Sequence, residues 1–192
     1  MNNEFETLSK IIKERRSIFP VSYIKKEIPT AVIEQILESA NYAPTHKLTQ
    51  PWRFVVIRNE AKARLGAALG ARYQETVTSA QFMQKKYDSF AQKTEQAACI
   101  LAVNIQFHPD LLPEWEEIAA TAAAVQNIAL TAAALNIGSY WSSPSVIDGL
   151  TDFLELQENE KCYGLFYMGY HLDEPRKANR TPMANKVKWL EA

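Results

Sequence analysis

Two arginines and a serine stand next to one another near the N-terminus, at Arg15, Arg16 and Ser17. A guanidinium is a planar fork of hydrogen-bond donors that matches phosphate oxygens, and a serine hydroxyl adds one short donor. The triplet could therefore bind a phosphate group. The alternative is that the two cations simply lie at the C-terminal end of a helix, where they complement the helix dipole and stay solvated. The triplet by itself leaves both interpretations open.

A second candidate segment is a polar loop bracketed by Pro44 and Pro51, which stiffen the chain just before a β-branched, aromatic run. Rigid loops of this kind suit recognition of a ring that has several carbonyl and N–H edges. The side chains that could do this are Tyr42, Thr45, His46 and Gln50. The alternative is an ordinary connection between a helix and a strand, with a solvated histidine.

Two further segments carry weaker signals. Glycine, serine and aromatic residues stand together at 138–144, where an element junction can present backbone N–H groups to a ligand. The candidate contacts in that segment are Tyr140, Trp141 and Ser142. A basic loop at 176–182 contains Lys177 and Arg180, which could bind an anion or belong to a solvated tail.

Other common kinds of chemical site have little support. The histidines at 46, 108 and 171 share no HxH, HExxH or Cys/His spacing, which argues against a metal site. Cys99 and Cys162 lie in apolar, strand-like runs and are expected to be reduced core residues. The sequence has only 6 glycines and contains neither GxGxxG nor GxxxxGK[ST], which argues against a Rossmann or P-loop nucleotide site.

The elements that must position these segments are a few strands separated by helices. Apolar and β-branched runs predict strands at 52–57, 97–105, 139–141 and 162–170, with an edge strand at 187–190. Helical spacing predicts helices at 5–16, from Thr30 to before Pro44, and at 61–71, 76–93, 114–137 and 145–154. Gly138 is expected to close the long helix in a left-handed conformation. Helices that occur two in a row favour an α+β fold over a doubly wound sheet.

Length and composition are those of one globular domain over residues 1–192, with 47% hydrophobic and 22% charged residues. The net charge of -1 gives no general reason to expect nucleic acid or an anionic membrane as a partner. Residues 118–147 carry no charge, but alanine dominates them and polar residues interrupt them, so a buried helix is expected rather than a membrane span. The N-terminus lacks the apolar core of a signal peptide, and a cytoplasmic location is expected.

The order and spacing of the four segments together resemble the nitroreductase family of FMN enzymes, particularly its short members. In that family an Arg-Arg-Ser or Arg-His-Ser triplet ends the first helix, as at 15–17, and an Ala-Pro…Gln-Pro-Trp loop follows the second, as at 43–52. A turn from glycine to tryptophan follows the long helix, as at 138–141, and a Gly-Tyr…Arg-x-Pro segment closes the chain, as at 169–182. The resemblance implies a nitroreductase-like α+β fold: a central, mostly antiparallel sheet flanked by helices, with a long Ala-rich central helix, assembled as a homodimer.

The resemblance also implies roles for individual residues. Arg15, Arg16 and Ser17 are expected to hold the phosphate and ribityl chain of FMN, with Lys177 or Arg180 helping at the phosphate. The residues expected to reach the flavin from the other subunit are Tyr42, Thr45, His46 and Gln50, and those along the isoalloxazine are Tyr140, Trp141 and Ser142. Two positions depart from the family pattern. Ser142 stands where several short relatives have arginine, and Leu48 stands where larger relatives often carry asparagine.

The reaction implied by the resemblance is a ping-pong transfer. NAD(P)H reduces FMN and leaves, and a nitroaromatic, quinone or related acceptor then takes the electrons. Flavin chemistry supplies the reactivity, so no side chain is expected to be an obligatory acid, base or nucleophile. Two alternatives stay open at this stage. One is a protein that stores or senses FMN with little turnover, and the other is a helical interaction protein that binds no flavin.

Overall fold

The computed structural model describes residues 3–174 and 176–191. Its sheet has four strands, β1 (Trp52–Ile57), β2 (Cys99–Gln106), β3 (Ile137–Ser142) and β4 (Glu160–Tyr170). They lie in the order β1-β2-β4-β3, and every neighbouring pair is antiparallel. The predicted α+β class with an antiparallel central sheet is confirmed.

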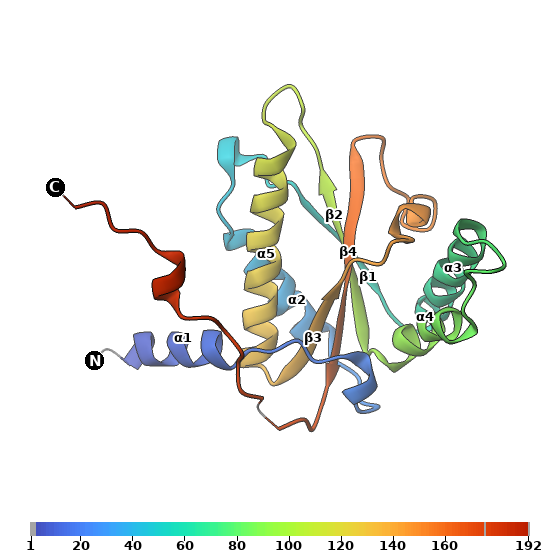
Figure 1. Ribbon diagram of the computed structural model, residues 1–192, viewed down its shortest axis with the longest axis horizontal. Helices are drawn as coiled ribbons and strands as arrows, with labels where there is room; N and C mark the ends of the chain where they lie inside the picture. Colours follow the sequence, from blue (N-terminus) through green and yellow to red (C-terminus); the bar gives the residue numbers. More distant parts are fainter. Residues whose placement is uncertain (1–2, 175, 192) are drawn as a thin grey trace.

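Helices cover both faces of this sheet. They are α1 (Asn3–Glu14), α2 (Thr30–Glu38), α3 (Glu60–Thr76), α4 (Gln84–Gln96) and α5 (Glu114–Ala134). Figure 1 shows α5 and α2 on one side of the sheet and α3 with α4 on the other, while α1 extends away from the body. The central strand β2 is therefore buried on both faces. Leu101 and Val103 belong to the core under α5, and Ile100 and Ala102 belong to the core under α3 and α4.

The long helix α5 forms because alanine is the best helix former and because three glutamates in its first turn complement the helix dipole. Its buried stripe includes Ala124, Ile128 and Ala132, and the small alanine side chains let the helix lie close to the sheet. Within 3–174 and 176–191, no helix combines the length and apolarity that crossing a membrane requires.

The end of α5 differs from the prediction. Asn136, with φ 56°, takes the left-handed conformation, and Gly138 lies inside β3 with no positive φ. Asparagine tolerates this region better than most residues because its short side chain can bond locally. What Gly138 provides is space, since a side chain there would collide with Ile18 and His171.

Other predicted boundaries were wrong in recognisable ways. The predicted helix at 76–93 begins only at Gln84, because the Thr78 N–H and hydroxyl both donate to the Gln81 side chain in a turn that precedes α4. The predicted helix at 145–154 is only a short 3-10 helix, η4 (Ile147–Leu150), followed by turns. The first helix ends at Glu14, and the described residues 187–190 form no strand.

Candidate functional site

The segment after α1 runs along the outer edge of β3. Ser17 pairs with Ser139 in a parallel bridge, and the Ile18 N–H donates to the Ser139 carbonyl over 2.9 Å. This pairing is possible because Gly138 has no side chain to push Ile18 away. Two of the four candidate segments, far apart in the sequence, are thereby brought side by side.

A cavity of about 190 Å³ opens where these two segments meet α5. Arg15, Ser17, Ser139, Trp141 and Phe166 form its walls. Its remaining lining comes from a face of α5 made largely of small side chains: Ala122, Val125, Gln126 and Ala129. The cavity therefore combines a cation, hydroxyl groups and aromatic surface, the mixture that suits an anionic ligand with an aromatic ring.

The Arg15 guanidinium is partly buried and makes no hydrogen bond or ion pair with residues 3–174 or 176–191. Burial lowers the pKa of Arg15, and the neighbouring charges of Arg16 and Arg180 lower it further. The charge of Arg15 is thus repelled by two neighbouring cations. An anion placed in this cavity would relieve that repulsion and satisfy the free donors of Arg15.

Arg16 is used differently from Arg15. Its guanidinium donates to the backbone carbonyls of Lys13, Arg15 and Arg176 over 2.6, 2.7 and 2.8 Å. Arg176 returns a hydrogen bond to the Ser17 carbonyl over 2.7 Å. This reciprocal pair fastens the C-terminal segment to the end of α1, so Arg16 holds the chain around the cavity.

The basic loop contributes one charge to the neighbourhood of the cavity. Arg180 is exposed, donates to the carbonyl of Asn179 over 3.0 Å and lowers the pKa of Arg15 through its charge. Lys177 is also exposed but is not among the residues that line the cavity. Of the two cations offered by the sequence, Arg180 is the one placed near Arg15.

The third candidate segment is divided between the two faces of the sheet, because side chains alternate along a strand. Trp141 lines the Arg15 cavity. Tyr140 lies on the opposite face, with its ring 4.5 Å from Phe19 and 6.3 Å from Tyr167 between centroids. Ser142 has the same parity as Tyr140. Only Trp141 of these three residues is brought together with Arg15.

The loop 42–50 lies at the other end of α5. His46 Nδ1 is 2.5 Å from Glu116 Oε2, and Lys47 Nζ donates to the Leu111 carbonyl over 2.8 Å. Tyr42 is fully at the surface, 78% exposed. None of the loop residues lines the Arg15 cavity, so a single chain separates the two halves of the expected site.

The backbone of this loop is strained. Lys47, Leu48 and Gln50 have φ values of 50°, 56° and 45°, in the left-handed region that costs a non-glycine residue on the order of 1 kcal/mol. Inside the loop, the Gln50 N–H donates to Thr45 Oγ1 over 3.0 Å. Such a conformation persists only where surrounding contacts hold it.

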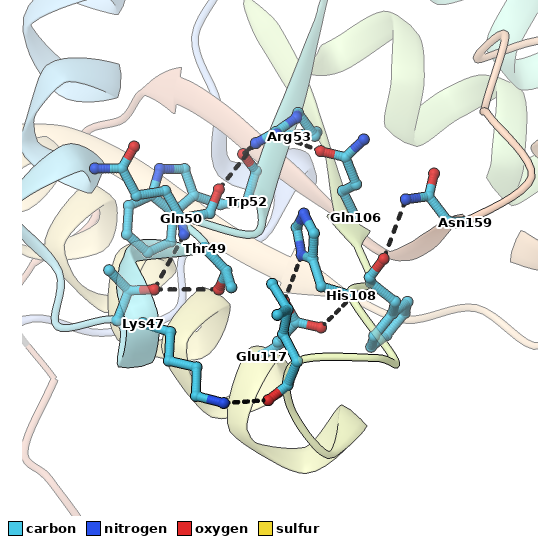
Figure 2. Close-up of polar contacts among 12 residues, drawn as sticks. Lys47, Thr49, Gln50, Trp52, Arg53, Gln106, His108, Glu117 and Asn159 are labelled. Atoms are coloured by element: carbon cyan, nitrogen blue, oxygen red, sulfur yellow. Dashed lines mark hydrogen bonds and ion pairs between the residues drawn. The ribbon is translucent and has the colours of Figure 1, made fainter.

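A buried carboxylate lies beside the loop's attachment point. Glu117 is 1% exposed and accepts two hydrogen bonds from His108, one from its backbone N–H over 2.8 Å and one from Nδ1 over 2.7 Å. Asn159 donates to the Phe107 carbonyl over 3.0 Å, so the segment after β2 is held from both sides. Figure 2 shows this cluster next to Lys47, Thr49 and Gln50.

Sequence reasoning missed several of these participants. Arg176, Glu116 and Glu117 each hold a segment in place, and Phe166 forms one wall of the cavity. Nothing in their local sequence distinguishes them from solvated charges or a core aromatic. Only Arg176 could have been suspected from the sequence, because it belongs to the basic loop at 176–182.

Comparison with known proteins identifies the family of this chain. A sequence model described as the nitroreductase family matches residues 12–170. The chain belongs to the nitroreductase family. The family expected from the four motifs and the oxidoreductase class that it implies are thus confirmed.

Individual relatives cover the chain almost completely. YfhC of Bacillus subtilis (strain 168), provisionally named an NAD(P)H nitroreductase, is 30% identical over 190 residues, which are 96% of this chain and 94% of YfhC. A nitroreductase-like family protein from Bacillus cereus has the same fold, with a TM-score of 0.85 at 24% identity over 96% of both chains. The FMN-dependent nitroreductase NfnB of Mycobacterium smegmatis, solved with NADPH, gives 0.80 at 16% identity, covering 98% of this chain and 100% of NfnB.

Proposed function

We propose that this member of the nitroreductase family is an FMN-dependent NAD(P)H oxidoreductase, built as one FMN-binding domain over residues 1–192. The observation that carries the proposal is Arg15, a partly buried cation with no counter-ion in the described residues, in a cavity with Ser17 and Trp141. The names of its relatives support the choice of cofactor, since NfnB is described as FMN-dependent and as complexed with NADPH. The expected cytoplasmic location stays a prediction.

The residues present fit FMN in chemical type. Arg15, with Arg180 nearby, would bind the phosphate, because guanidiniums form charge-assisted hydrogen bonds to phosphate oxygens. The Ser17 hydroxyl would donate to the phosphate or ribityl chain, and Trp141, which is 38% exposed, offers aromatic surface to the ring. Arg16 would act indirectly, by holding Arg176 and the end of α1 in place.

A second copy of the chain is needed to complete the site. Arg15 and Ser139 line both the cavity of about 190 Å³ beside Trp141 and a larger one of about 600 Å³ beside α1, and no residue of the loop 42–50 lines either of them. The loop 42–50, with Tyr42, Thr45, His46 and Gln50, lies away from both cavities in its own chain. We infer that the loop of the partner subunit closes the site across a homodimer interface.

Two uncovered apolar surfaces support a dimer. Helix α1 has no buried residue, and Phe5, Leu8 and Ile12 share its exposed face. In the C-terminal segment, Trp189 is 79% and Leu190 is 85% exposed. Large apolar side chains gathered in this way are expected at a protein interface. Light scattering of the protein should give the mass of two chains, and a monomer that retains bound flavin would contradict the proposed site.

Bound FMN would supply the redox chemistry, in a ping-pong cycle in which NAD(P)H reduces it and leaves before a nitroaromatic, quinone or related acceptor takes the electrons. The protein's own part is to hold the phosphate, to orient the ring against Trp141 and to close the cavity. No side chain is assigned as an obligatory acid, base or nucleophile.

The visible spectrum of the purified protein tests the cofactor. The protein should be yellow as isolated or after addition of FMN, and should release FMN rather than FAD on denaturation. Finding FAD, or no uptake of FMN at micromolar concentration, would overturn the assignment. Continuous NAD(P)H oxidation with a quinone or nitroaromatic separates an enzyme from a sensor, which would be reduced once and then stop.

A further inference from the structure

Two neighbouring glutamates at the start of α5 hold the segments beside the proposed cofactor-binding loop. Glu116 contacts His46 within that loop, and Glu117 contacts His108 in the segment after β2. An ionised carboxylate can only accept hydrogen bonds, so the imidazole Nδ1 is the donor in both pairs. The His46–Glu116 contact joins residues 70 positions apart, whereas His108 and Glu117 are nine positions apart and fix the connection between β2 and α5.

The loop needs external support because its own contacts are few. Lys47, Leu48 and Gln50 adopt left-handed backbone conformations. Inside the loop, Thr45 Oγ1 bonds to the Gln50 N–H and to Thr49 Oγ1, and the Thr49 N–H donates to the His46 carbonyl. These internal contacts do not reach the rest of the molecule. At its two ends the loop is held by the Ala43 N–H, which donates to the Ala40 carbonyl, and by the Gln50 carbonyl, which accepts from Arg53. Its middle is held by the contacts of His46 with Glu116 and of Lys47 with the Leu111 carbonyl.

Glu117 fixes the chain segment that contains Leu111, the residue whose carbonyl accepts from Lys47. Leu111 lies three residues after His108. His108 is bonded through its backbone N–H and its ring to the buried Glu117 carboxylate, and the Leu111 N–H donates to the His108 carbonyl over 2.9 Å. The anchor of Lys47 is thus part of a hydrogen-bonded segment that is itself fixed to α5 (Figure 2).

We propose that Glu116 is a positioning residue for FMN binding, which it serves by holding His46 and with it the strained loop 42–50 in the conformation that meets the cofactor of the partner subunit. This inference rests on the proposed function, because the loop is taken to reach FMN across the dimer. Glu116 itself contacts no ligand. Its carboxylate restricts the loop, so that Tyr42, Thr45 and Gln50 are already ordered before FMN binds and no further conformational entropy is lost on binding.

The test compares Glu116→Ala with Glu114→Ala, a matched control in the same helical turn. Glu114 is exposed and pairs only with the exposed Lys161, 3.5 Å away, within the described residues. Hydrogen–deuterium exchange of the amides at 45–50, measured without added flavin, should quicken about tenfold in Glu116→Ala and stay at the wild-type rate in Glu114→Ala. Because the loop is less ordered, the FMN dissociation constant should rise about three- to tenfold in Glu116→Ala alone.

Two further variants separate positioning from a general loss of structure. Glu116→Gln keeps an acceptor oxygen for His46 and should restore most of the FMN affinity. The double variant His46→Ala/Glu116→Ala should bind FMN no more weakly than the weaker of the two single variants, because each single variant already removes the same His46–Glu116 contact. Unchanged exchange in Glu116→Ala, or equal FMN binding by Glu116→Ala and Glu114→Ala, would overturn the inference. Failure of the wild-type protein to bind FMN would instead refute the proposed function, and the exchange experiment would still decide whether Glu116 holds the loop.

Discussion

The two ends of α5 carry charged residues in opposite states. At its N-terminal end the carboxylates of Glu116 and Glu117 each pair with a histidine. Beside its C-terminal half, Arg15 lies near Arg16 and Arg180 without a counter-ion among the described residues. A charge that is satisfied within the chain fixes structure, whereas a partly buried charge left without a partner is available to a ligand. The difference assigns a supporting role to one end and a binding role to the other.

The largest effect is expected from breaking the buried pair. Glu117→Ala would leave the His108 N–H and ring without their acceptor and leave a gap in the interior, which should lower the free energy of unfolding by about 3 kcal/mol. Urea denaturation of Glu117→Ala measures this, with Glu114→Ala as the exposed control. A loss no greater than that of Glu114→Ala would mean that the paired end does not support the fold.

At the unpaired end, Arg15→Ala should weaken binding and leave stability intact. Loss of charge-assisted hydrogen bonds to a phosphate removes roughly 1.5–3 kcal/mol, which corresponds to FMN binding about ten- to a hundredfold more weakly. Riboflavin lacks the phosphate, so its affinity should hardly change. Titration of both flavins into Arg15→Ala and into Arg64→Ala, an exposed arginine on α3, decides the matter. Equal FMN affinity in the two variants would refute the phosphate contact.

The exposed apolar face of α1 predicts that a second chain covers this helix. Leu8 is 53% exposed, so Leu8→Asp should leave each chain folded and weaken the dimer about tenfold or more, because a charge would enter the interface. Met83→Asp is the control, since Met83 is 60% exposed in the segment before α4. Sedimentation at decreasing concentration should show dissociation only for Leu8→Asp. If both variants dissociate alike, α1 is not part of the interface.

The smallest effect is expected from the cysteines, which belong to neither end. Burial raises the pKa of both the Cys99 and Cys162 thiols to about 11, so at pH 8 only about one thiol in a thousand is a thiolate. A thiol reagent should therefore label the folded protein very slowly at this pH and rapidly after unfolding in urea. Fast labelling of the native protein would show that the sheet opens more readily than its burial implies.

The sequence alone predicted the elements whose pattern is local. β-Branched and aromatic runs located β1, β2 and β4, and alanine content located α5. The same local patterns failed where side-chain hydrogen bonds decide the backbone. The turn between Thr78 and Gln81 interrupts a sequence with helical spacing, and Asn136 rather than Gly138 ends α5.

The four motifs likewise indicated the family, but residue type does not say which of several like residues lines the cavity beside α5. Arg15 and Arg16 are adjacent and chemically identical, yet one faces the cavity and the other binds backbone carbonyls. Trp141 and Tyr140 are adjacent aromatic residues, and strand alternation sends them to opposite faces of the sheet. The sequence determines which side chains are available, because chemistry is a property of residue type. Only the tertiary structure decides which of them converge, because convergence depends on contacts such as Arg16 with Arg176 that join residues 160 positions apart.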